Sequence, residues 1–366
     1  MKTTRGWPAP SLRYLAGMCD DNGLFEHARF DRPRRDHGYC TDDAGRALSL
    51  ACRLPVDPHA QHLAELTIRF LERAHNGEGS FRLRMGQDGS WRPDGPSDDA
   101  SGRALLGLGV AAARGPWPEI NRRAATLFGA ACAFRSPWPR SMAYAALGAA
   151  EVLSVDPGHE VARRLLMDAS GQLSAKSVQS PWDWPEPRLT YANALLPEAL
   201  LACAVAIERP ELAFRALTWL GQLVEIELSP TGRFSFTPVG GRGPSDPRPA
   251  FDQQPIEAWA MADACTRALA FSGDKRWEDV LWRAGSWFLG DNDCAAVMFD
   301  PVSGGGYDGL GPGGPNRNQG AESSLAFVGT MLQLDRVLGA TQRALRASSS
   351  WDTEAVAAPT QRSAAP

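Results

Sequence analysis

Pairs of acidic residues recur in this sequence just before segments that are apolar and rich in small side chains. Asp42 and Asp43 precede the first of two GRAL runs, and Asp98 and Asp99 precede the second. Glycosidic cleavage uses two carboxyl groups: one donates a proton to the leaving oxygen, and the other activates water or attacks the anomeric carbon. The repeated acid pairs are therefore candidates for this chemistry.

Carboxyl and amide side chains also occur at two later positions of the same kind. Glu257 ends the segment FDQQPIE, and Glu322 ends the segment NQGAE. Both fall in apolar helical segments, where a carboxylate is costly unless it is paired or used. The sequence does not show which carboxyl group would hold the proton. We expect the catalytic acid and base to be among Asp42, Asp43, Asp99, Glu257 and Glu322.

Structural roles are the alternative for these acids. A short acidic side chain at a helix start can cap free N–H groups and suits the positive end of the helix, which would explain Asp42 or Asp98 taken alone. Arg46 follows Asp42 by four residues and Arg103 follows Asp99 by four, so a buried ion-pair network is a second structural explanation. Capping alone does not explain why the acids are doubled.

Twelve tryptophans are many for 366 residues, and several lie in segments rich in Gly and Pro. Flat aromatic rings can stack on the C–H faces of sugars, so Trp91, Trp138 and the two tryptophans of PWDWPEP fit a glycan cleft. The alternative is that a tryptophan fills the core, as we expect for Trp219, Trp277, Trp282 and Trp287. We expect the substrate to contact His37, Tyr39, Arg46, Asp98, Arg103, Trp182, Trp184, Tyr191, Asp252, Gln253, Gln254, Tyr307, Asn318 and Gln319.

Two kinds of apolar segment alternate along the chain and would position these residues. The first kind is amphipathic at helical spacing: in 59–74, Leu63, Leu66 and Phe70 form a stripe, while Glu65 faces away. Helices with one solvated face belong in an outer layer. The segments of this kind lie near 10–18, 59–74, 119–133, 159–173, 210–226 and 276–289.

The second kind is apolar on nearly all sides and rich in small residues. Such a helix must be buried on every side, and small residues let helices pack closely at a crowded centre. The segments are 44–54, 102–113, 141–153, 194–206, 256–271 and 322–334. Six outer and six inner helices in strict alternation predict an all-α fold, an (α/α)6 toroid of six helical hairpins. An open solenoid of hairpins is the alternative.

Long segments rich in Gly, Pro and aromatic residues precede several inner helices. They cover 75–97, 180–190, 229–251 and 301–317, and long loops on one face of a domain usually carry its function. Parts of them, at 81–85 and 232–238, alternate well enough to predict short β-hairpins. The glycine-rich run at 303–316 lacks the ending and the preceding strand of a phosphate-binding loop, so we interpret it as a rim loop.

Bulk properties exclude several classes of protein. The net charge is −4 with Lys and Arg scattered along the chain, so we expect no nucleic-acid partner. No apolar run follows the N-terminal charges or approaches the roughly 20 residues that span a bilayer, so we expect no membrane partner and a cytoplasmic location. The seven cysteines lie apart and are predicted to be free thiols. We expect one domain over 1–346 and a disordered tail over 347–366.

Four motifs resemble those of a family of bacterial six-hairpin, glycosidase-like proteins, whose members are often labelled as glycosyltransferases or encoded beside glycan-active genes. They read HGYCTDDAGRAL (37–48), LTYANALLPEAL (189–200), FDQQPIEAWA (251–260) and NQGAESSLAF (318–327). The resemblance extends to about residue 337 and implies a toroid and a glycan substrate. It does not fix the reaction, because several chemistries share the architecture. The sequence departs from the family signature at Ala44, where the family has Asn.

We therefore expect a glycoside hydrolase acting on an oligosaccharide or polysaccharide, without a cofactor. A phosphorylase would also need a phosphate pocket, for which Arg242 and Arg317 are candidates. A sugar epimerase would use histidines as its acid and base, but none of the six histidines lies on a predicted inner helix. His27 and His37 also lack the spacing of metal ligands, so we predict no metal site. A non-catalytic glycan-binding partner of a glycosyltransferase is the third alternative. The sequence does not indicate the oligomeric state.

Overall fold

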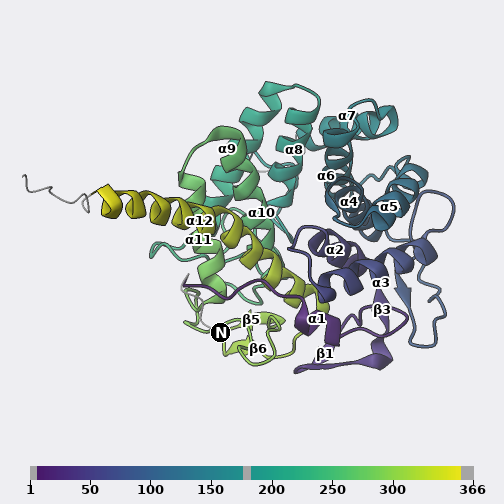
Figure 1. Ribbon diagram of the computed structural model, residues 1–366, viewed down its shortest axis with the longest axis horizontal. Helices are drawn as coiled ribbons and strands as arrows, with labels where there is room; N and C mark the ends of the chain where they lie inside the picture. The colour runs from purple at the N-terminus through teal and green to yellow at the C-terminus, as the bar shows by residue number, and fades with distance from the viewer. Residues whose placement is uncertain (1–5, 176–182, 356–366) are drawn as a thin grey trace, which may run out of the picture.

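The computed structural model describes residues 6–175 and 183–355, and helices dominate this part of the chain. Outer and inner helices alternate along the chain, as predicted (Figure 1). The outer helices are α1 (Arg13–Gly17), α3 (Pro58–Ala74), α5 (Pro118–Ala131), α7 (Glu160–Ser174), α9 (Pro210–Glu227) and α11 (Arg276–Phe288). The inner helices are α2 (Thr41–Ala51), α4 (Asp98–Arg114), α6 (Pro139–Val155), α8 (Leu195–Ala206), α10 (Pro255–Ser272) and α12 (Ala321–Ala355).

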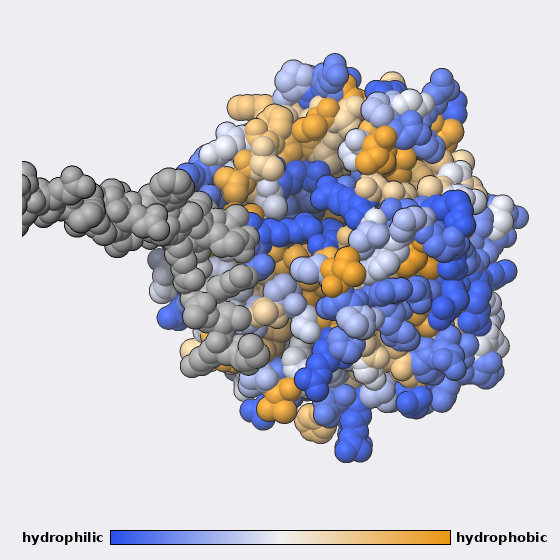
Figure 2. Space-filling view, in the orientation of Figure 1, coloured by the Kyte–Doolittle hydropathy of each residue, from blue (hydrophilic) through white to orange (hydrophobic). Residues whose placement is uncertain are grey.

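The inner helices form a closed ring. Each packs against the next along the chain, from α2 to α12, and α12 packs back against α2. This last contact excludes the open solenoid and confirms the (α/α)6 toroid. Figure 2 shows hydrophilic side chains bordering a hollow at the centre of the ring.

Local sequence explains where the helices begin. Proline occupies one of the first two positions of α3, α5, α6, α9 and α10, where its missing N–H costs nothing. Asp57 caps α3 by accepting from the Ala60 N–H at 2.8 Å. Ser97 caps α4 by accepting from the Ala100 N–H at 3.3 Å. The cap of α4 is therefore Ser97, which leaves Asp98 and Asp99 free for other contacts.

Glycines bring the inner helices α2, α4 and α6 into backbone contact, as the small residues of these segments predict. A Cβ on Gly148 of α6 would lie 2.2 Å from the Leu105 carbonyl oxygen of α4, and one on Gly109 would lie 2.2 Å from the Gly148 carbonyl oxygen. A Cβ on Gly45 of α2 would lie 2.6 Å from the Arg103 carbonyl oxygen. Only glycine at these positions lets the helices approach so closely. These closely packed helices position the arginines at the ring centre.

We expect Gly148→Ala to lower the free energy of unfolding by about 1–3 kcal/mol or more, because the new methyl group must push two helices apart. The matched control is Gly129→Ala on the outer helix α5, where nothing lies within 4 Å of the added Cβ. This control should gain about 0.5–1 kcal/mol, because alanine favours a helix over glycine. Urea unfolding measures both changes. Equal stability of Gly148→Ala and the wild type would contradict the close packing.

The strands are short and antiparallel. They are β1 (Ala28–Arg29) with β2 (Arg32–Pro33), β3 (Tyr39–Cys40) with β4 (Arg84–Met85), and β5 (Gly309–Gly311) with β6 (Gly314–Asn316). β3 follows a single 3-10 turn, Arg35–His37. The glycine-rich rim loop thus contains the hairpin β5–β6.

The two β-hairpins predicted from alternation are present only in part, mainly as isolated bridges. In 81–85, only Arg84–Met85 forms a strand, and it pairs with the distant β3, while Met85 also bridges to Trp91. In 232–238 there is no strand among the described residues, and Phe234 and Pro238 make isolated bridges to Leu228 and Gln253. The bridges from Met85 to Trp91 and from Leu228 to Phe234 are local, so the pairing that alternation suggested is present as single bridges, and more distant segments supply the other partners.

The last inner helix is longer than the apolar segment 322–334 that predicted it. Helix α12 continues to Ala355, past Ala347, where we placed the start of the tail, and residues 356–366 lie outside the described part. The extent of the domain therefore stays a prediction. No helix in the described part of the chain is long and apolar enough to cross a membrane.

Candidate active site

The first turns of the inner helices bring four of the five predicted carboxyl groups onto two buried arginines. Arg46 lies on α2 and Arg103 on α4, and their side chains are 7% and 6% exposed. A buried guanidinium needs carboxylate partners, and each of these two has a pair of them. We call the end of the ring that carries these groups the mouth.

Arg46 joins Asp43 to Glu322. Its Nη1 atom donates to Asp43 Oδ1 at 2.8 Å, and its Nη2 atom lies 2.6 Å from Glu322 Oε2. Residues 43 and 322 are far apart in sequence, so closure of the ring creates this pairing. The Asp43 side chain is 4% exposed, whereas that of Glu322 is 39% exposed. One carboxyl group of the pair is therefore buried and the other is open to solvent.

Arg103 joins Asp42 to Asp99. Its Nη1 atom lies 2.9 Å from Asp42 Oδ1 and 3.4 Å from Asp99 Oδ2. The guanidinium also lies over the rings of Tyr144 and Tyr191, 4.5 and 5.6 Å from their centroids. Asp99 is fixed from its other side, because the hydroxyls of Ser141 and Tyr191 both donate to its carboxylate.

The two adjacent acids of α2 have pKa values shifted in opposite directions. Burial raises the pKa of Asp43 to about 8, because the acids Glu322, Glu26 and Asp42 add to the effect of burial and Arg46 offsets only part of it. Burial also tends to raise the pKa of Asp42, but the positive charges of Arg103 and Arg46 have a larger, opposite effect. The pKa of Asp42 therefore lies below its usual value. At neutral pH Asp43 thus holds a proton, while Asp42 is ionised.

The shifted pKa of Asp43 also predicts how stability depends on pH. An unfolded aspartate has a pKa of about 4. Between about pH 4 and pH 8, Asp43 is therefore protonated in the folded protein and ionised in the unfolded chain. The free energy of unfolding falls as the pH rises through this range. Because an asparagine side chain cannot ionise, we expect Asp43→Asn to gain stability relative to the wild type from about pH 5 to about pH 9. Urea unfolding at both values measures this gain, and a constant difference would contradict a raised pKa.

A pocket of about 840 Å³ opens at the mouth beside Asp99. Trp138, the residue before α6, is 63% exposed and lines it, as do Asp98 and Tyr191. Its wall includes Arg140, which pairs with Glu186 at 2.5 Å and donates to Asn193 Oδ1 at 3.1 Å. The pocket thus combines an exposed indole ring with carboxylates, a pattern suited to a sugar.

Glu257 lies away from the two arginines. Its carboxyl group is buried and accepts from the backbone N–H of Ala192, from the Asn193 N–H at 3.1 Å and from Asn193 Nδ2 at 3.1 Å. Burial, then Glu227, raises its pKa to about 8. Through these hydrogen bonds Glu257 holds the segment that carries Tyr191, and the catalytic role that its position in the sequence suggested stays a prediction.

Several residues expected to contact substrate are instead buried in structural networks. Tyr39 is fully buried, and its hydroxyl donates to Asp20 at 2.7 Å. Gln253 accepts from Trp287 Nε1 at 3.2 Å, and its own amide donates to Asp293 at 2.6 Å. These side chains have no free face for a ligand in the mouth.

Three further candidates are also buried. Gln319 accepts from the Ser303 hydroxyl at 2.6 Å and is 2% exposed. Trp184 packs against Trp219, with ring centroids 5.9 Å apart. Arg242, proposed above for phosphate, is 2% exposed and donates to the carbonyl oxygen of Ser235 at 3.0 Å. Because Arg242 is buried and hydrogen-bonded to carbonyl oxygens, it is not available to bind phosphate in the rim loops.

The remaining candidates are more open. His37 is partly exposed, and its Nδ1 atom lies 3.2 Å from His27 Nδ1. Asn318 accepts from the backbone N–H of Phe30 at 3.0 Å. Asp252 is exposed, Gln254 immediately precedes α10, and Tyr307 is partly buried. Arg317 is exposed, and Trp182 lies outside the described residues.

The sequence analysis missed Arg140, Ser141 and Asp308. Arg140 and Ser141 begin the third inner helix, α6, which has no acid pair and therefore gave no signal. Their position at an inner-helix start was the available clue. Asp308 accepts from the Gly320 N–H at 2.7 Å, and burial raises its pKa, with Glu322 adding to the rise and His27 opposing it. Nothing in the glycine-rich loop distinguished this aspartate.

Comparison with known proteins gives matches in structure alone. The sequence matches no protein-family model and no curated protein. A sugar epimerase from a ruminal bacterium superposes with a TM-score of 0.67 at 13% identity, covering 88% of this chain and 94% of its own. The cellobiose 2-epimerase of Bacillus thermoamylovorans B4167 gives 0.66 at 12% identity, covering 89% and 96%.

A cellulase is similar as well. Cel9M of C. cellulolyticum, solved in complex with cellobiose, gives a TM-score of 0.60 at 9% identity and covers 87% of this chain and 88% of its own. Identities this low establish shared architecture and do not test the motif family that the sequence resembles. The chain shares the six-hairpin (α/α)6 toroid with sugar epimerases and with a cellulase.

Proposed function

We propose that this protein is a carbohydrate-active enzyme, a glycoside hydrolase that cleaves a bacterial oligosaccharide or polysaccharide at the mouth of the ring. The observation that carries the proposal is that the pKa values of two neighbouring carboxyl groups are shifted in opposite directions. Asp43 is protonated and Asp42 is ionised at neutral pH, which supplies one general acid and one general base. The exposed ring of Trp138 supports a sugar substrate, because it lines a pocket with Asp99, which shares Arg103 with Asp42.

In this mechanism Asp43 donates its proton to the glycosidic oxygen as the bond from that oxygen to the anomeric carbon breaks. Asp42 accepts a proton from water, whose oxygen bonds to the anomeric carbon. Attack by water in a single step inverts the configuration at that carbon. Arg46 and Arg103 position the acids, and Glu322 and Asp99, which are more exposed, remain candidates for contact with the substrate.

The structural neighbours support a carbohydrate substrate. They are named as a sugar epimerase, a cellobiose 2-epimerase and a cellulase crystallised with cellobiose. The same set includes both epimerases and hydrolases, so it does not choose between these reactions. That choice rests on the acids and on the histidines of this chain.

A sugar epimerase is the second candidate, and one observation favours it. His27 and His37 lie 3.2 Å apart between their Nδ1 atoms, in the segment that precedes α2. His27 is close enough to Asp308 to lower the pKa of that carboxyl group, and Glu322 also acts on Asp308. Although neither histidine lies on an inner helix, the pair is near the mouth and could move a proton at a sugar carbon.

One experiment separates the reactions. The protein is incubated with α- and β-linked oligosaccharides in D2O, with and without phosphate, and the products are followed by NMR. Hydrolysis releases new reducing ends without phosphate, whereas phosphorolysis requires phosphate and yields a sugar phosphate. Epimerisation leaves the linkage intact and incorporates deuterium at the epimerised carbon. Binding without any product would contradict the proposal and favour a non-catalytic glycan-binding partner.

We expect Trp138→Ala to raise KM by about 2- to 10-fold with little change in kcat, because stacking contributes about 0.5–1.5 kcal/mol in ground and transition states alike. The matched control is Trp282→Ala on the outer helix α11, where the ring is 39% exposed and packs against Trp7. Initial-rate kinetics on the cleaved oligosaccharide measure both constants. An unchanged KM would remove Trp138 from the binding site.

A further inference from the structure

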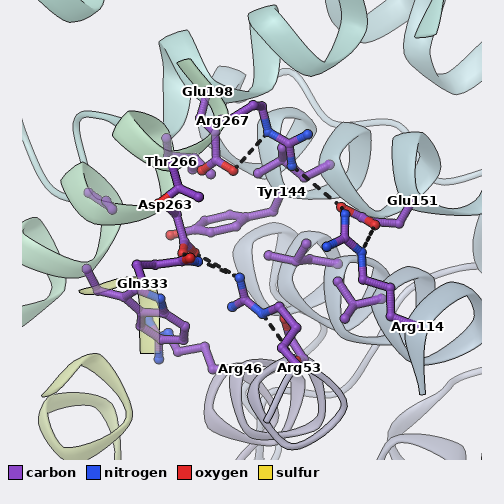
Figure 3. Close-up of a pocket in the computed structure, with 18 of the residues that line it drawn as sticks. Arg46, Arg53, Arg114, Tyr144, Glu151, Glu198, Asp263, Thr266, Arg267 and Gln333 are labelled. Carbon is purple, nitrogen blue, oxygen red and sulfur yellow. Dashed lines mark hydrogen bonds and ion pairs between the residues drawn. The ribbon is translucent and has the colours of Figure 1, made fainter. Parts of the chain in front are cut away.

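A second cavity opens at the end of the ring axis opposite the mouth. It has a volume of about 240 Å³ (Figure 3). Its rim lies beyond the C-terminal half of several inner helices: Arg53 follows α2, Arg114 ends α4, and Arg267 and Arg336 lie along α10 and α12. None of the residues of this rim takes part in the chemistry proposed for the mouth. We call this cavity the far pocket.

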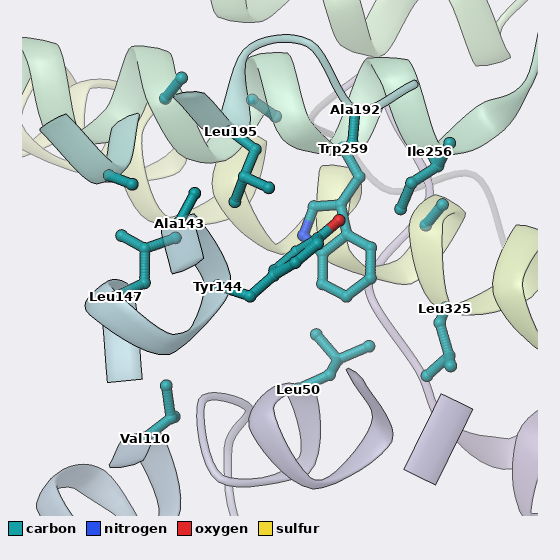
Figure 4. Close-up of a cluster of buried hydrophobic side chains, with 14 of the residues drawn as sticks. Leu50, Val110, Ala143, Tyr144, Leu147, Ala192, Leu195, Ile256, Trp259 and Leu325 are labelled. Carbon is teal, nitrogen blue, oxygen red and sulfur yellow. The ribbon is translucent and has the colours of Figure 1, made fainter. Parts of the chain in front are cut away.

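Aromatic rings separate the far pocket from the mouth. Tyr144 and Trp259 both line the pocket and belong to the buried cluster drawn in Figure 4. Tyr144 contacts the Arg103 guanidinium of the mouth at 4.5 Å from its ring centroid, while Trp259 lies under the Arg53 guanidinium of the rim at 5.8 Å. The side walls are apolar and include Leu106, Val110, Leu147, Leu195 and Ile256.

The rim carries an excess of positive charge. Three of its four arginines pair with carboxylates: Arg53 with Asp263 at 3.2 Å, Arg114 with Glu151 at 2.9 Å, and Arg267 with Glu198 at 3.2 Å. Arg336 donates to the Arg53 carbonyl oxygen at 2.8 Å and pairs with no carboxylate in the described part of the chain. One guanidinium at the rim is thus open to an anion.

Four residues that line the far pocket also carry a buried polar atom without a partner. Ser49 Oγ, Gln333 Oε1, Trp259 Nε1 and Arg46 Nε make no hydrogen bond among the described residues. Their residues are 1%, 3%, 6% and 7% exposed. A buried polar atom left unpaired costs about 1–3 kcal/mol and is uncommon. Four residues of one cavity wall thus carry polar atoms that the described residues leave unsatisfied.

The combination of walls and polar atoms indicates the chemistry of the occupant. An aromatic floor and aliphatic walls favour an apolar body, since a mostly apolar cavity holds water poorly. Arg336, which pairs with no carboxylate among the described residues, favours an anionic group at the rim. We propose that the far pocket is a second ligand site, which binds a small organic anion with an apolar body and one phosphate or carboxylate group.

Arg46 connects the two ends of the ring. Its Nη atoms hold Asp43 and Glu322 at the mouth, while its Nε atom is unpaired and the residue lines the far pocket. Substituting Arg46 would therefore disturb both sites. The test uses Arg336 and Ala260, which line only the far pocket.

Isothermal titration calorimetry of the full chain tests the proposal, with phenyl phosphate and benzoate as probes. Inorganic phosphate and phenol supply the anionic group and the apolar body separately. We expect one or both probes to bind at least about tenfold more tightly than either fragment, because the pocket engages both parts. Comparison of phenyl phosphate with benzoate then identifies the preferred anionic group.

Variants locate the binding. Arg336→Gln removes an exposed guanidinium that pairs with no carboxylate among the described residues, and it should weaken binding by about tenfold or more. Ala260→Leu fills the cavity and should abolish binding, with circular dichroism confirming the fold. Arg69→Gln, an exposed change on α3, is the matched control and should bind normally. Binding no tighter than that of inorganic phosphate, or binding unchanged in both pocket variants, would overturn the proposal.

Discussion

Replacing Asp43 with asparagine is expected to lower kcat on an oligosaccharide by about 10²–10⁴-fold, the usual contribution of a general acid. The asparagine has no acidic proton to give the leaving oxygen, while the hydrogen bond to Arg46 can persist through its amide oxygen. The loss should be much smaller on an aryl glycoside with an acidic phenol, because that leaving group departs without a proton. Steady-state kinetics on the two substrates measure the contrast.

The control for this change is Asp168→Asn, an identical substitution at an exposed acid of the outer helix α7. It should retain the wild-type kcat on both substrates. The pH profile provides a second readout: wild-type kcat should fall above about pH 8 as Asp43 loses its proton. Equal loss on both substrates would show that Asp43 is not the general acid.

Replacing Glu257 with alanine is expected to lower the free energy of unfolding by about 3–5 kcal/mol. Its carboxyl group accepts three hydrogen bonds from Ala192 and Asn193, and each buried donor left without an acceptor costs about 1–3 kcal/mol. Tyr191 lies between the mouth and this anchor, so substrate binding should weaken as well. Urea unfolding and KM measure the two effects.

Glu160→Ala, at an exposed acid in the first turn of α7, is the matched control and should change stability by less than about 0.5 kcal/mol. The experiment also decides between two roles for Glu257. If Glu257→Ala keeps wild-type stability but loses kcat, Glu257 is a catalytic acid, as its position in the sequence suggested, and the anchoring role is wrong.

Much of the architecture could be predicted because each layer leaves its own pattern. The stripe of Leu63, Leu66 and Phe70 identifies α3 as an outer helix, and all three residues are buried. The glycines of 102–113 identify α4 as an inner helix, and Gly109 touches α6. Ring closure was predicted only from the number of hairpins, since six pairs complete one turn of a toroid. The contact between α12 and α2 confirms it, although no local pattern relates these two segments.

The site was predicted less completely than the fold. Asp42 and Asp99 were aligned by their GRAL runs and do meet on one arginine. The ion pairs offered as the structural alternative are also present, so the acids proposed for catalysis are the same acids that pair with Arg46 and Arg103. Which acid is protonated depends on burial and on charges from other helices, such as Glu322 beside Asp43, and these have no signature in the sequence.

Tyr39 and Gln253 were predicted to contact the substrate, but both are buried. They stand beside the acid motifs in sequence, and that proximity suggested contact with substrate. A residue next to a motif can point either into the mouth or behind it, and only the packing decides. Tyr39 turns to Asp20, and Gln253 turns to Trp287 and Asp293.

The release of reducing ends from oligosaccharides by four proteins tests the central claim most directly. These are the wild type, Asp42→Asn, Asp43→Asn and the control Asp168→Asn. The account predicts that the wild type and Asp168→Asn cleave the same oligosaccharide without phosphate, and that both mouth variants lose this cleavage. Cleavage at wild-type rates by Asp42→Asn and Asp43→Asn, or none by the wild type on any α- or β-linked oligosaccharide, would contradict it.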